Sequence, residues 1–560
     1  MISSPLRYGV IADRDRVFAW ESRCVRRLQE SGLAALDFVA CEDPASGAEP
    51  AVNDIISELA GEVATHFPLV ALDELADREV LRLDARGIAA KTQELALDFL
   101  LVFGTPEARF EAGRATRAGA WAFVSSDPSS FSSPMPCFWE IYHDEPVTGA
   151  ALLRLTDPSA LGLPLQRGFF PVAHDSLRQS IEAVFTFLPE WPVDACKRVL
   201  ENGPDAFLQP NLPTPARVLG LPSKTEIQKL HSIEARARRA LQRERKHYLI
   251  EWNIGIMDAP ASAFIGRDER AIVKLLLPSR KRRYVADPCV VTVRDQQYVF
   301  CEEYPYDTGQ GFIACFEIQN RHGSNLARAI QSEGHLSYPQ VFEHDGALYC
   351  LPESGSADKV VLYKAQRFPH QWVLDRTLID GFAAVDSTLL RSENKWWLFC
   401  SSGERGFRAF NSHLYLWHAD SLFGPWSPHA RNPVKIDVRS ARPAGQCFYH
   451  EGAWYRPAQD CSRRYGGAIK INRIDQLDER EFHETVVGTI RPPTGDYDKG
   501  IHTVSSSNGL TIVDVQRTVF EPRSLISATW AMAQGAARKA GVSEPALTRL
   551  KRWLKGSRPS

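Results

Sequence analysis

The chain has 560 residues, enough for two to four domains with sizeable cores. Its formal net charge of −2 argues against a protein built mainly to hold nucleic acid. The first twenty residues lack the apolar core of a signal peptide, and no stretch approaches the ~18 uninterrupted apolar residues of a membrane span. The eleven cysteines form no CxxC pair or other metal-binding spacing. We therefore expect a cytoplasmic globular protein with no metal and no cofactor.

The first 190 residues alternate strand-like and helix-like patterns. A helical run over 20–32 ends at Gly32, where a helix stop is expected. Parallel strands covered on both faces read as short apolar runs, and three such runs occur at 8–13, 36–43 and 97–104. Residues 1–190 are therefore predicted to form an α/β domain with a mostly parallel sheet. No GxGxxG follows the first run, so a dinucleotide is not expected.

Residues 191–249 are predicted to connect this domain to the second half. A proline-rich stretch over 204–222 precedes a helix in which Ser223 and Glu226 have capping-box spacing. One side of that helix is apolar and the other basic, which is typical of a helix docked on one face and solvated on the other.

Beyond residue 250 the pattern changes to short strands separated by turns. A similar phrase recurs about every 50 to 60 residues, which is the period of a β-propeller built from several strands per repeat. Five such units predict an all-β five-bladed β-propeller over 250–522, and the run 252–257 is expected to supply the strand that closes the ring. Residues 523–560 are predicted to form a helical tail.

The polar residues that open the five units are expected to converge, because the first strand of each propeller blade lines the central channel. The ends of the second strands add further polar groups. Carboxylate pairs with aromatic faces nearby are typical of carbohydrate sites. An alternative stays open, in which the Asp-Pro and Asp-Ser phrases only shape turns. The predicted ring comprises Asp287, Tyr338, Asp386, Arg442 and His502, with Glu302, Glu303, Glu353, Arg456 and Asp460 from the second strands.

Several phrases of the N-terminal half resemble the formyltransferase family that includes methionyl-tRNA formyltransferase and sugar-nucleotide N-formyltransferases. The matching features are Phe103-Gly104 at a strand end, the Pro-x-Phe-Trp segment from Pro136, and the run 145–149 (EPVTG). The resemblance covers most of residues 1–185. It implies transfer of a formyl group from 10-formyltetrahydrofolate to an amine.

The side chains that this chemistry requires are missing at the matching positions. The resemblance implies an Asn and a His at one strand end and an Asp before a later glycine, which polarise the formyl group and relay a proton. Ala122, Val124 and Ala160 stand there instead, and their side chains neither donate, accept nor titrate. We therefore expect a degenerate domain kept for binding or scaffolding. An amino-sugar N-formyltransferase with a rebuilt site remains the alternative.

The propeller phrases carry a second resemblance, to the N-terminal propeller domain of plant glucosamine inositolphosphorylceramide transferases. It spans about 250–520 and rests on motifs such as 286–288 (ADP), 352–354 (PES) and 441–445 (ARPAG). The units also resemble five-bladed glycoside hydrolases. By that analogy Asp287 would be the base, Asp386 would tune pKa values, and Glu353 or Glu302 would be the acid. Tyr338, Arg442, Arg456, Asp460 and His502 would bind substrate.

The leading hypothesis is therefore a carbohydrate-active or glycan-binding protein that takes a glycan, glycolipid or sugar nucleotide. A non-enzymatic module that recognises envelope glycans or glycolipids is a further alternative. Residues 543–556 have a basic amphipathic pattern that is typical of a helix at the surface of an anionic membrane. This pattern leaves open peripheral contact with the inner face of the membrane, although a helix packed on the protein is the favoured interpretation.

Overall fold

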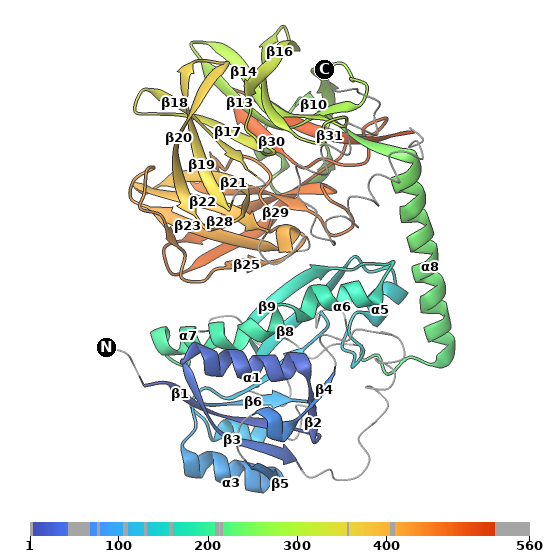
Figure 1. Cartoon of the computed structure of the whole chain (residues 1–560), viewed down its shortest axis with the longest axis vertical. Coiled ribbons are helices and arrows are strands. Elements are labelled where there is room, and N and C mark those ends of the chain that lie inside the picture. The colour runs from blue at the N-terminus through green and yellow to red at the C-terminus, as the bar shows by residue number, and fades with distance from the viewer. Residues whose placement is uncertain are drawn as a thin grey trace, which may run out of the picture.

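The computed structural model describes residues 4–42, 68–75, 79–104, 110–127, 131–155, 161–205, 207, 212, 217–354, 358–403 and 409–520. Two bodies lie one above the other and are joined along one side by the long helix α8 (Lys224–His247), as Figure 1 shows. Ala160 and the predicted helix 543–556 lie outside the described residues.

The N-terminal body is built on a seven-stranded sheet in the order β5-β3-β1-β6-β7-β8-β9. The first five strands in this order are mutually parallel. β8 then runs antiparallel to both of its neighbours, β7 and β9. This arrangement confirms the predicted α/β domain with a mostly parallel sheet. The strands are β1 (Leu6–Ala12), β3 (Ala34–Glu42), β5 (Val80–Leu83), β6 (Phe99–Phe103), β7 (Ala120–Val124), β8 (Val147–Leu155) and β9 (Leu163–Pro171).

Both faces of the sheet are covered, which explains why its strands read as continuous apolar runs. One core contains Tyr8, Phe99 and Trp121 and packs against α1 (Ala19–Ser31), α6 (Leu177–Phe185) and α7 (Trp191–Asn202). The opposite core packs against α3 (Ala85–Leu95) and α4 (Phe110–Arg114). A two-stranded antiparallel sheet of β2 (Arg16–Phe18) and β4 (Leu69–Ala71) and the helix α5 (Phe138–Tyr142) complete this body.

The predicted boundary at residue 190 is wrong by one helix. Trp191, Cys196 and Val199 of α7 are buried in the same core as β1 and β6, so α7 belongs to the α/β domain rather than to the linker. The proline-rich stretch hid this packing because it begins only after α7 ends.

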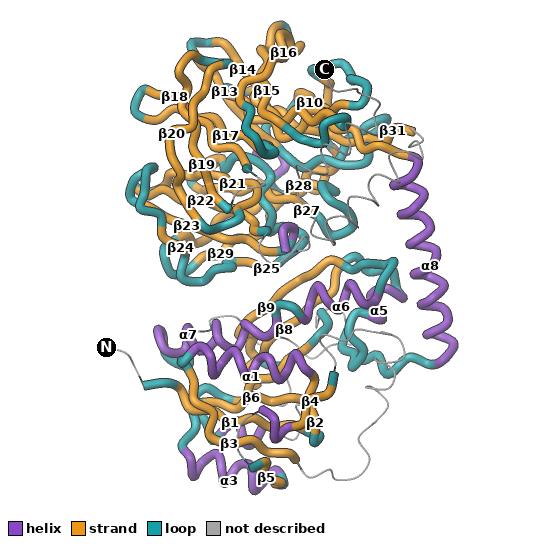
Figure 2. The backbone as a smooth tube through the Cα atoms, viewed as in Figure 1, coloured by secondary structure: helices purple, strands orange, loops and turns teal. Residues whose placement is uncertain are grey.

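Helix α8 begins as predicted, with a reciprocal capping box between Ser223 and Glu226. Leu230 is its buried residue, and it packs on the α/β core together with Ile227 and Ile233. The C-terminal half of α8 is largely exposed. Figure 2 shows this purple helix leading directly into the propeller.

The C-terminal body consists of five sheets, which are the five predicted blades, and all strand pairs in them are antiparallel except that of β11 with β29 in the fourth blade. Three blades are formed by consecutive strands: β13 (Arg283–Val293) to β16 (His322–Ile330), β17 (Ser337–His344) to β20 (Gln371–Asp380), and β21 (Ala384–Ser392) to β24 (Ser427–Pro428). Their middle strands are β14 (Gln296–Pro305), β15 (Phe312–Gln319), β18 (Ala347–Glu353), β19 (Lys359–Arg367), β22 (Lys395–Ser402) and β23 (His413–Ala419).

The last two blades combine distant segments. The fourth contains β26 (Phe448–His450), β27 (Ala453–Asp460), β28 (Ala468–Leu477), β29 (Phe482–Arg491) and the distant β11 (Asp268–Arg270). In the fifth, β30 (Val504–Ser507) and β31 (Leu510–Phe520) join β10 (Tyr248–Met257) and β12 (Val273–Leu275). β10 pairs with β31 over its whole length, which confirms that 252–257 closes the ring.

The two bodies share a tight contact at the edge of the sheet. The backbone of β9 pairs with the propeller segment that follows β25 (Lys435–Ile436), where the amide of Val438 donates to the carbonyl of Phe169 at 3.0 Å. Ile436 is buried in the α/β core. The propeller is therefore docked on the α/β domain by both backbone pairing and apolar packing.

Candidate functional site on the central face of the propeller

Three of the predicted ring residues share an unusual backbone conformation. Asp287, Tyr338 and Asp386 open the first strands of three blades, and all have positive φ angles of 55°, 44° and 52°. At each of them the pairing with the second strand slips, which marks a β-bulge. L-residues rarely adopt this conformation, so the repeated bulge is a built feature that re-aims these side chains toward one another.

Asp287 is at the centre of a cluster that ties three blades together. Its Oδ1 lies 3.0 Å from Nε2 of His502 and accepts from the Thr503 hydroxyl at 3.1 Å. The other ring nitrogen of His502, Nδ1, lies 2.9 Å from Oδ1 of Asp514. Burial disfavours a charge on His502, but the carboxylates of Asp514 and Asp287 outweigh it and raise the pKa of His502 to about 10. The cluster is therefore an imidazolium held between two carboxylates.

The same three residues are close enough to hold a metal ion, since ligand atoms of Asp287, His502 and Asp514 lie within 4.8 Å of one another. A histidine binds a metal through a nitrogen lone pair. In this structure the two ring nitrogens of His502 lie within ion-pair distance of the two carboxylates, Nε2 beside Asp287 and Nδ1 beside Asp514. The arrangement is that of an ion-pair triad.

Asp386 forms a second cluster on the neighbouring part of the ring. Its Oδ2 accepts from Nε of Arg442 at 2.6 Å and from the side-chain amide of Gln459 at 2.9 Å. The backbone amide of Asp386 donates to Oε2 of Glu353 at 3.0 Å. Asp386 thus accepts from two donors, one of which is the buried guanidinium of Arg442, and such charge-assisted hydrogen bonds favour a carboxylate.

Two glutamates of the ring hold their protons to high pH. Burial, followed by the neighbouring carboxylate of Asp386, raises the pKa of Glu353 to about 8. Burial also raises the pKa of Glu302 well above its ordinary value, and the charges of Asp287 and Glu353 add to this effect. Both glutamates therefore favour the protonated form more than an exposed glutamate does.

Aromatic side chains lie beside the two clusters. The rings of Trp252 and His502 have centroids 4.1 Å apart, and Arg442 lies over Tyr465 at 4.9 Å. Tyr465 is 40% exposed, and the imidazole of His335 contacts Glu302 with Nε2 at 3.4 Å from Oε1. Aromatic faces beside carboxyl groups are suited to stacking on a sugar ring while its hydroxyls are hydrogen-bonded.

The interior of the ring is nearly filled by side chains. A cavity of about 10 Å³, roughly the room of one water molecule, remains among side chains that include Asp287, Tyr338 and Gln340. Of the four predicted catalytic carboxyls, Asp287, Glu302 and Asp386 are buried, whereas Glu353 is partly exposed. Glu353 is therefore the most accessible carboxyl of the four.

The prediction that Arg456 binds substrate is wrong. Its side chain is 0% exposed and donates to both carboxylate oxygens of Glu484, at 2.6 and 2.9 Å. Its remaining donors reach the carbonyls of Ser440 and Ala441. Four of its five N–H donors are used within the fourth blade and the segment before it. The sequence could not show this because Glu484 lies in the next hairpin.

Two further predicted residues have local roles in the structure. Asp460 accepts from the amide and the hydroxyl of Ser462, so it shapes the turn after β27. Glu303 points away from Glu302, as alternate residues of a strand do, and pairs with Arg280 and Arg283 at 2.9 Å. Tyr338 stays in the ring, where its hydroxyl contacts that of Thr388 at 3.0 Å.

The sequence analysis missed four residues that complete the site: Trp252, Gln459, Tyr465 and Asp514. Asp514 was detectable in principle, because it is the one charged residue in the apolar run 510–515 (LTIVDV). The other three carry no pattern of their own and are identified only by their contacts with His502, Asp386 and Arg442.

The corresponding region of the α/β domain offers no such groups. Ala122 is 1% exposed and packs in the apolar core on the α3 side of the sheet, and Val124 ends the same strand. Neither position presents a donor, an acceptor or a titratable group.

The propeller matches a known protein family. Residues 275–503 match the family model described as the N-terminal region of glucosamine inositolphosphorylceramide transferase 1. This match confirms the resemblance predicted for the C-terminal half. It covers less than half of the chain, and the α/β domain lies outside it.

Curated relatives carry the same name. Glucosamine inositolphosphorylceramide transferase 1 from Oryza sativa subsp. japonica is 36% identical over 208 residues, which is 36% of this chain and 28% of the rice protein. The protein of that name from Arabidopsis thaliana is 35% identical over 216 residues, covering 38% and 28%. The chain thus matches less than a third of the length of these relatives.

Solved structures with some likeness include the GH43_1 enzyme from Xanthomonas citri, at 12% identity and a TM-score of 0.33 over 44% of this chain and 91% of that one. A family 117 glycoside hydrolase from Zobellia galactanivorans has 12% identity and a TM-score of 0.32 over 48% and 90%. These TM-scores are too low to transfer a fold or a site. The five-bladed architecture rests on the sheet topology described above.

Within the described residues, no helix has both the length and the apolar character needed to cross a membrane.

Proposed function

We propose that the protein is carbohydrate-active and that its working site is the carboxyl ring on the central face of the propeller. The ring supplies aspartates paired with cationic side chains, glutamates with raised pKa values and aromatic surfaces within one group of contacting side chains. These are the groups that bind a sugar and that transfer protons at a glycosidic oxygen.

The pair formed by Glu353 and Asp386 carries this proposal. Asp386 is held by Arg442 and Gln459, while Glu353 beside it keeps its proton up to a pH of about 8. A partly exposed carboxylic acid that is protonated at neutral pH has the properties of a general acid. In this proposal Glu353 is the acid, Asp386 maintains its raised pKa, and Asp287 serves as the opposing carboxylate.

The relatives' name indicates which substrates to try first. A protein called glucosamine inositolphosphorylceramide transferase handles an amino sugar and a glycolipid, so we propose a glycolipid head group or a sugar nucleotide as the ligand class. The matched region is a minor part of those relatives, and transfer, hydrolysis and binding without turnover are distinguished by the experiment below.

The test is a binding and turnover screen with glycans, glycolipids and sugar nucleotides, using wild type, Glu353→Gln and Asp386→Asn. We expect turnover to fall at least a hundred-fold in both variants, a size common for a lost general acid. Asp375→Asn on the outer strand β20 is the control and should behave as wild type, because that residue pairs with Arg376 away from the ring.

Three outcomes decide the matter. Binding that is lost in Asp386→Asn, with turnover lost in Glu353→Gln, supports an enzyme. Binding without turnover in wild type supports a recognition module. Binding and turnover that are unchanged in Glu353→Gln, Asp386→Asn and Asp287→Asn would remove the ring as the working site.

We propose further that the α/β domain is a degenerate formyltransferase-like scaffold. The support is the apolar strand end at Ala122 and Val124. Calorimetry with a reduced-folate analogue tests this: no heat of binding is expected, and saturable binding would favour the amino-sugar N-formyltransferase with a rebuilt site and 10-formyltetrahydrofolate as its cofactor.

A further inference from the structure

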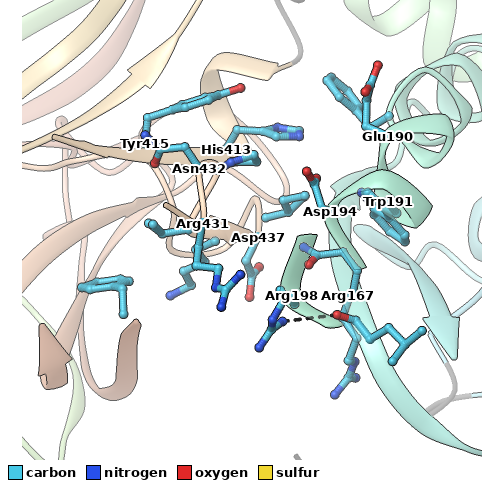
Figure 3. Close-up of a pocket in the computed structure, with 18 of the residues that line it drawn as sticks. Arg167, Glu190, Trp191, Asp194, Arg198, His413, Tyr415, Arg431, Asn432 and Asp437 are labelled. Atoms are coloured by element: carbon cyan, nitrogen blue, oxygen red, sulfur yellow. Dashed lines mark hydrogen bonds between the residues drawn. The ribbon is translucent and has the colours of Figure 1, made fainter. Parts of the chain in front are cut away.

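A second cavity lies between the two bodies, and none of the ring residues lines it. Its walls come from β9 and α7 on the α/β side, and on the propeller side from β23, the segment 430–437 and the start of β29. Figure 3 shows these side chains facing one another across the gap. The cavity has a volume of about 440 Å³, within the range of roughly 300–1,000 Å³ that is typical of small-molecule sites.

The acidic residues of the wall are already engaged by cations. Each of the four carboxylates has a basic partner within ion-pair distance, and none is left to neutralise the rest of the wall. The pairs are Glu190 with Arg27 at 2.8 Å, Asp194 with Lys197 at 3.1 Å, Asp437 with Arg439 at 2.8 Å, and Glu481 with Arg431 at 3.2 Å.

Arg198, on α7, is the first cation left over. Its Nε is buried and has no hydrogen-bond partner in the described part of the chain. One terminal nitrogen donates weakly to the carbonyl of Leu165 at 3.4 Å, which is the dashed line in Figure 3. Burial and the nearby charge of Arg431 lower the pKa of the Arg198 guanidinium. Glu481, Glu201 and Asp194 attract this charge from a distance, but no carboxylate of the described residues accepts a hydrogen bond from the Arg198 side chain.

Arg167, on β9, is the second. Its nearest carboxylate oxygen, on Asp127, is 3.9 Å away, beyond hydrogen-bonding distance. The guanidinium lies 5.1 Å from the ring centre of Phe169, whose ring is also contacted by Arg439. Burial lowers the pKa of Arg167 as well. Within the described residues neither arginine donates a hydrogen bond to a carboxylate, since Asp127 is only a distant ion-pair partner of Arg167, so both guanidinium groups keep donors for a ligand.

We propose that this interdomain cavity binds a small phosphorylated molecule, with its phosphoryl group held by Arg198 and Arg167 beside Arg431. Planar guanidinium groups match the oxygens of a phosphate through paired hydrogen bonds. The cavity is larger than a phosphate ion, so the ligand carries a further polar part. Because the walls come from both bodies, the bound molecule also ties the α/β domain to the propeller.

The experiment uses the full chain and titrates three probes by calorimetry at low ionic strength: inorganic phosphate, glucose 6-phosphate and UDP. Saturable binding of any of them is expected, and the probe that binds tightest identifies the molecule to which the phosphoryl group is attached. Arg198→Gln should weaken that binding at least ten-fold, and Arg167→Gln should weaken it as well.

Arg243→Gln provides the matched control, because it removes the same charge from an exposed position on α8. It should bind as wild type does. Asp386→Asn should also keep phosphate binding, which separates this cavity from the propeller ring and makes the two proposals fail independently.

Thermal unfolding supplies a second readout. Removing an unpaired, partly buried charge leaves Arg198→Gln at least as stable as wild type in phosphate-free buffer, whereas phosphate should raise the Tm of wild type only. If Arg198→Gln does not fold, Arg198→Lys replaces it, with weakened binding expected because the planar fork is lost. Wild type that shows no saturable binding, or arginine variants that bind as tightly as wild type, would overturn the proposal.

Discussion

Two buried glutamates, one in each body, show how differently the two regions accommodate charge. In the α/β domain, burial raises the pKa of Glu140 to about 7, and its partner is the neutral hydroxyl of Thr148 at 2.8 Å. In the propeller, burial acts on Glu484 in the same sense, but Arg456 and Lys435 outweigh it and lower the pKa of that carboxyl. The supply of cations, rather than burial itself, decides whether an acid keeps its proton.

The same contrast extends to the two candidate sites. The strand end at Ala122 and Val124 of the α/β sheet is apolar, whereas the propeller ring collects Asp287, Asp386 and His502 in paired contacts. The position of a functional site therefore has to be argued from the side chains present and not from the fold alone.

The largest expected effect is that of Glu484→Gln. The substitution leaves Arg456 buried beside a neutral amide, so we expect a loss of about 3–5 kcal/mol in the free energy of unfolding at pH 7. Because the folded-state pKa is lowered, the stabilisation by Glu484 is present above the ordinary value of 4.5 and disappears as the pH falls through the folded-state pKa. Urea unfolding at several pH values measures both.

The comparison with Glu140→Gln at pH 7 breaks or upholds the contrast. The two substitutions are chemically identical, and Glu484→Gln should be by far the more destabilising. Equal losses would show that burial alone governs both positions. Arg473→Gln, in an exposed pair with Asp475, controls for loss of a surface ion pair and should cost at most about 1 kcal/mol.

His502→Gln tests whether the ring is held by an imidazolium. With the pKa of His502 at about 10 against an ordinary 6.5, the charged form stabilises the fold fully below pH 6.5, and this contribution is lost as the pH rises through 10. Wild type should lose about 1 kcal/mol per pH unit within this window relative to the variant. Parallel pH profiles of wild type and His502→Gln would contradict a charged His502, and exposed His483→Gln is the control.

Glu140→Gln gives the smaller pH effect in the α/β domain. The folded protein holds the Glu140 proton up to a pH of about 7, whereas the unfolded chain releases it near 4.5, so wild type loses stability as the pH rises between these values. The loss relative to the pH-insensitive variant should be about 1 kcal/mol per pH unit. A wild-type profile that rises over this range would mean that Glu140 has found a cation.

Ser223→Ala has the smallest expected effect and concerns the helix that joins the two regions. It removes the hydroxyl that accepts from the amide of Glu226 at the start of α8, so we expect a loss of about 1 kcal/mol in the free energy of unfolding. Ser232→Ala, at an exposed position within the same helix, should change the stability by less than about 0.5 kcal/mol. Equal effects of the two variants would show that the cap does not stabilise the junction.

The sequence by itself determined the fold class, the repeat and most of the ring. Periodicity and turn residues are local properties, so the parallel sheet, the start of α8 at Ser223 and the five blades were predictable from short stretches of chain. Asp287, Tyr338 and Asp386 were also found this way, because the bulge that aims them recurs with the repeat.

Only the tertiary structure decided which partners each charged residue has. Arg456 meets Glu484 rather than a ligand, and His502 lies between Asp287 and Asp514. At the junction of the two bodies, Arg198 and Arg167 donate no hydrogen bond to a carboxylate of the described residues. The physical reason is that ion pairing and burial depend on contacts between residues far apart in the chain. Patterns within short stretches of sequence carry no information on those contacts.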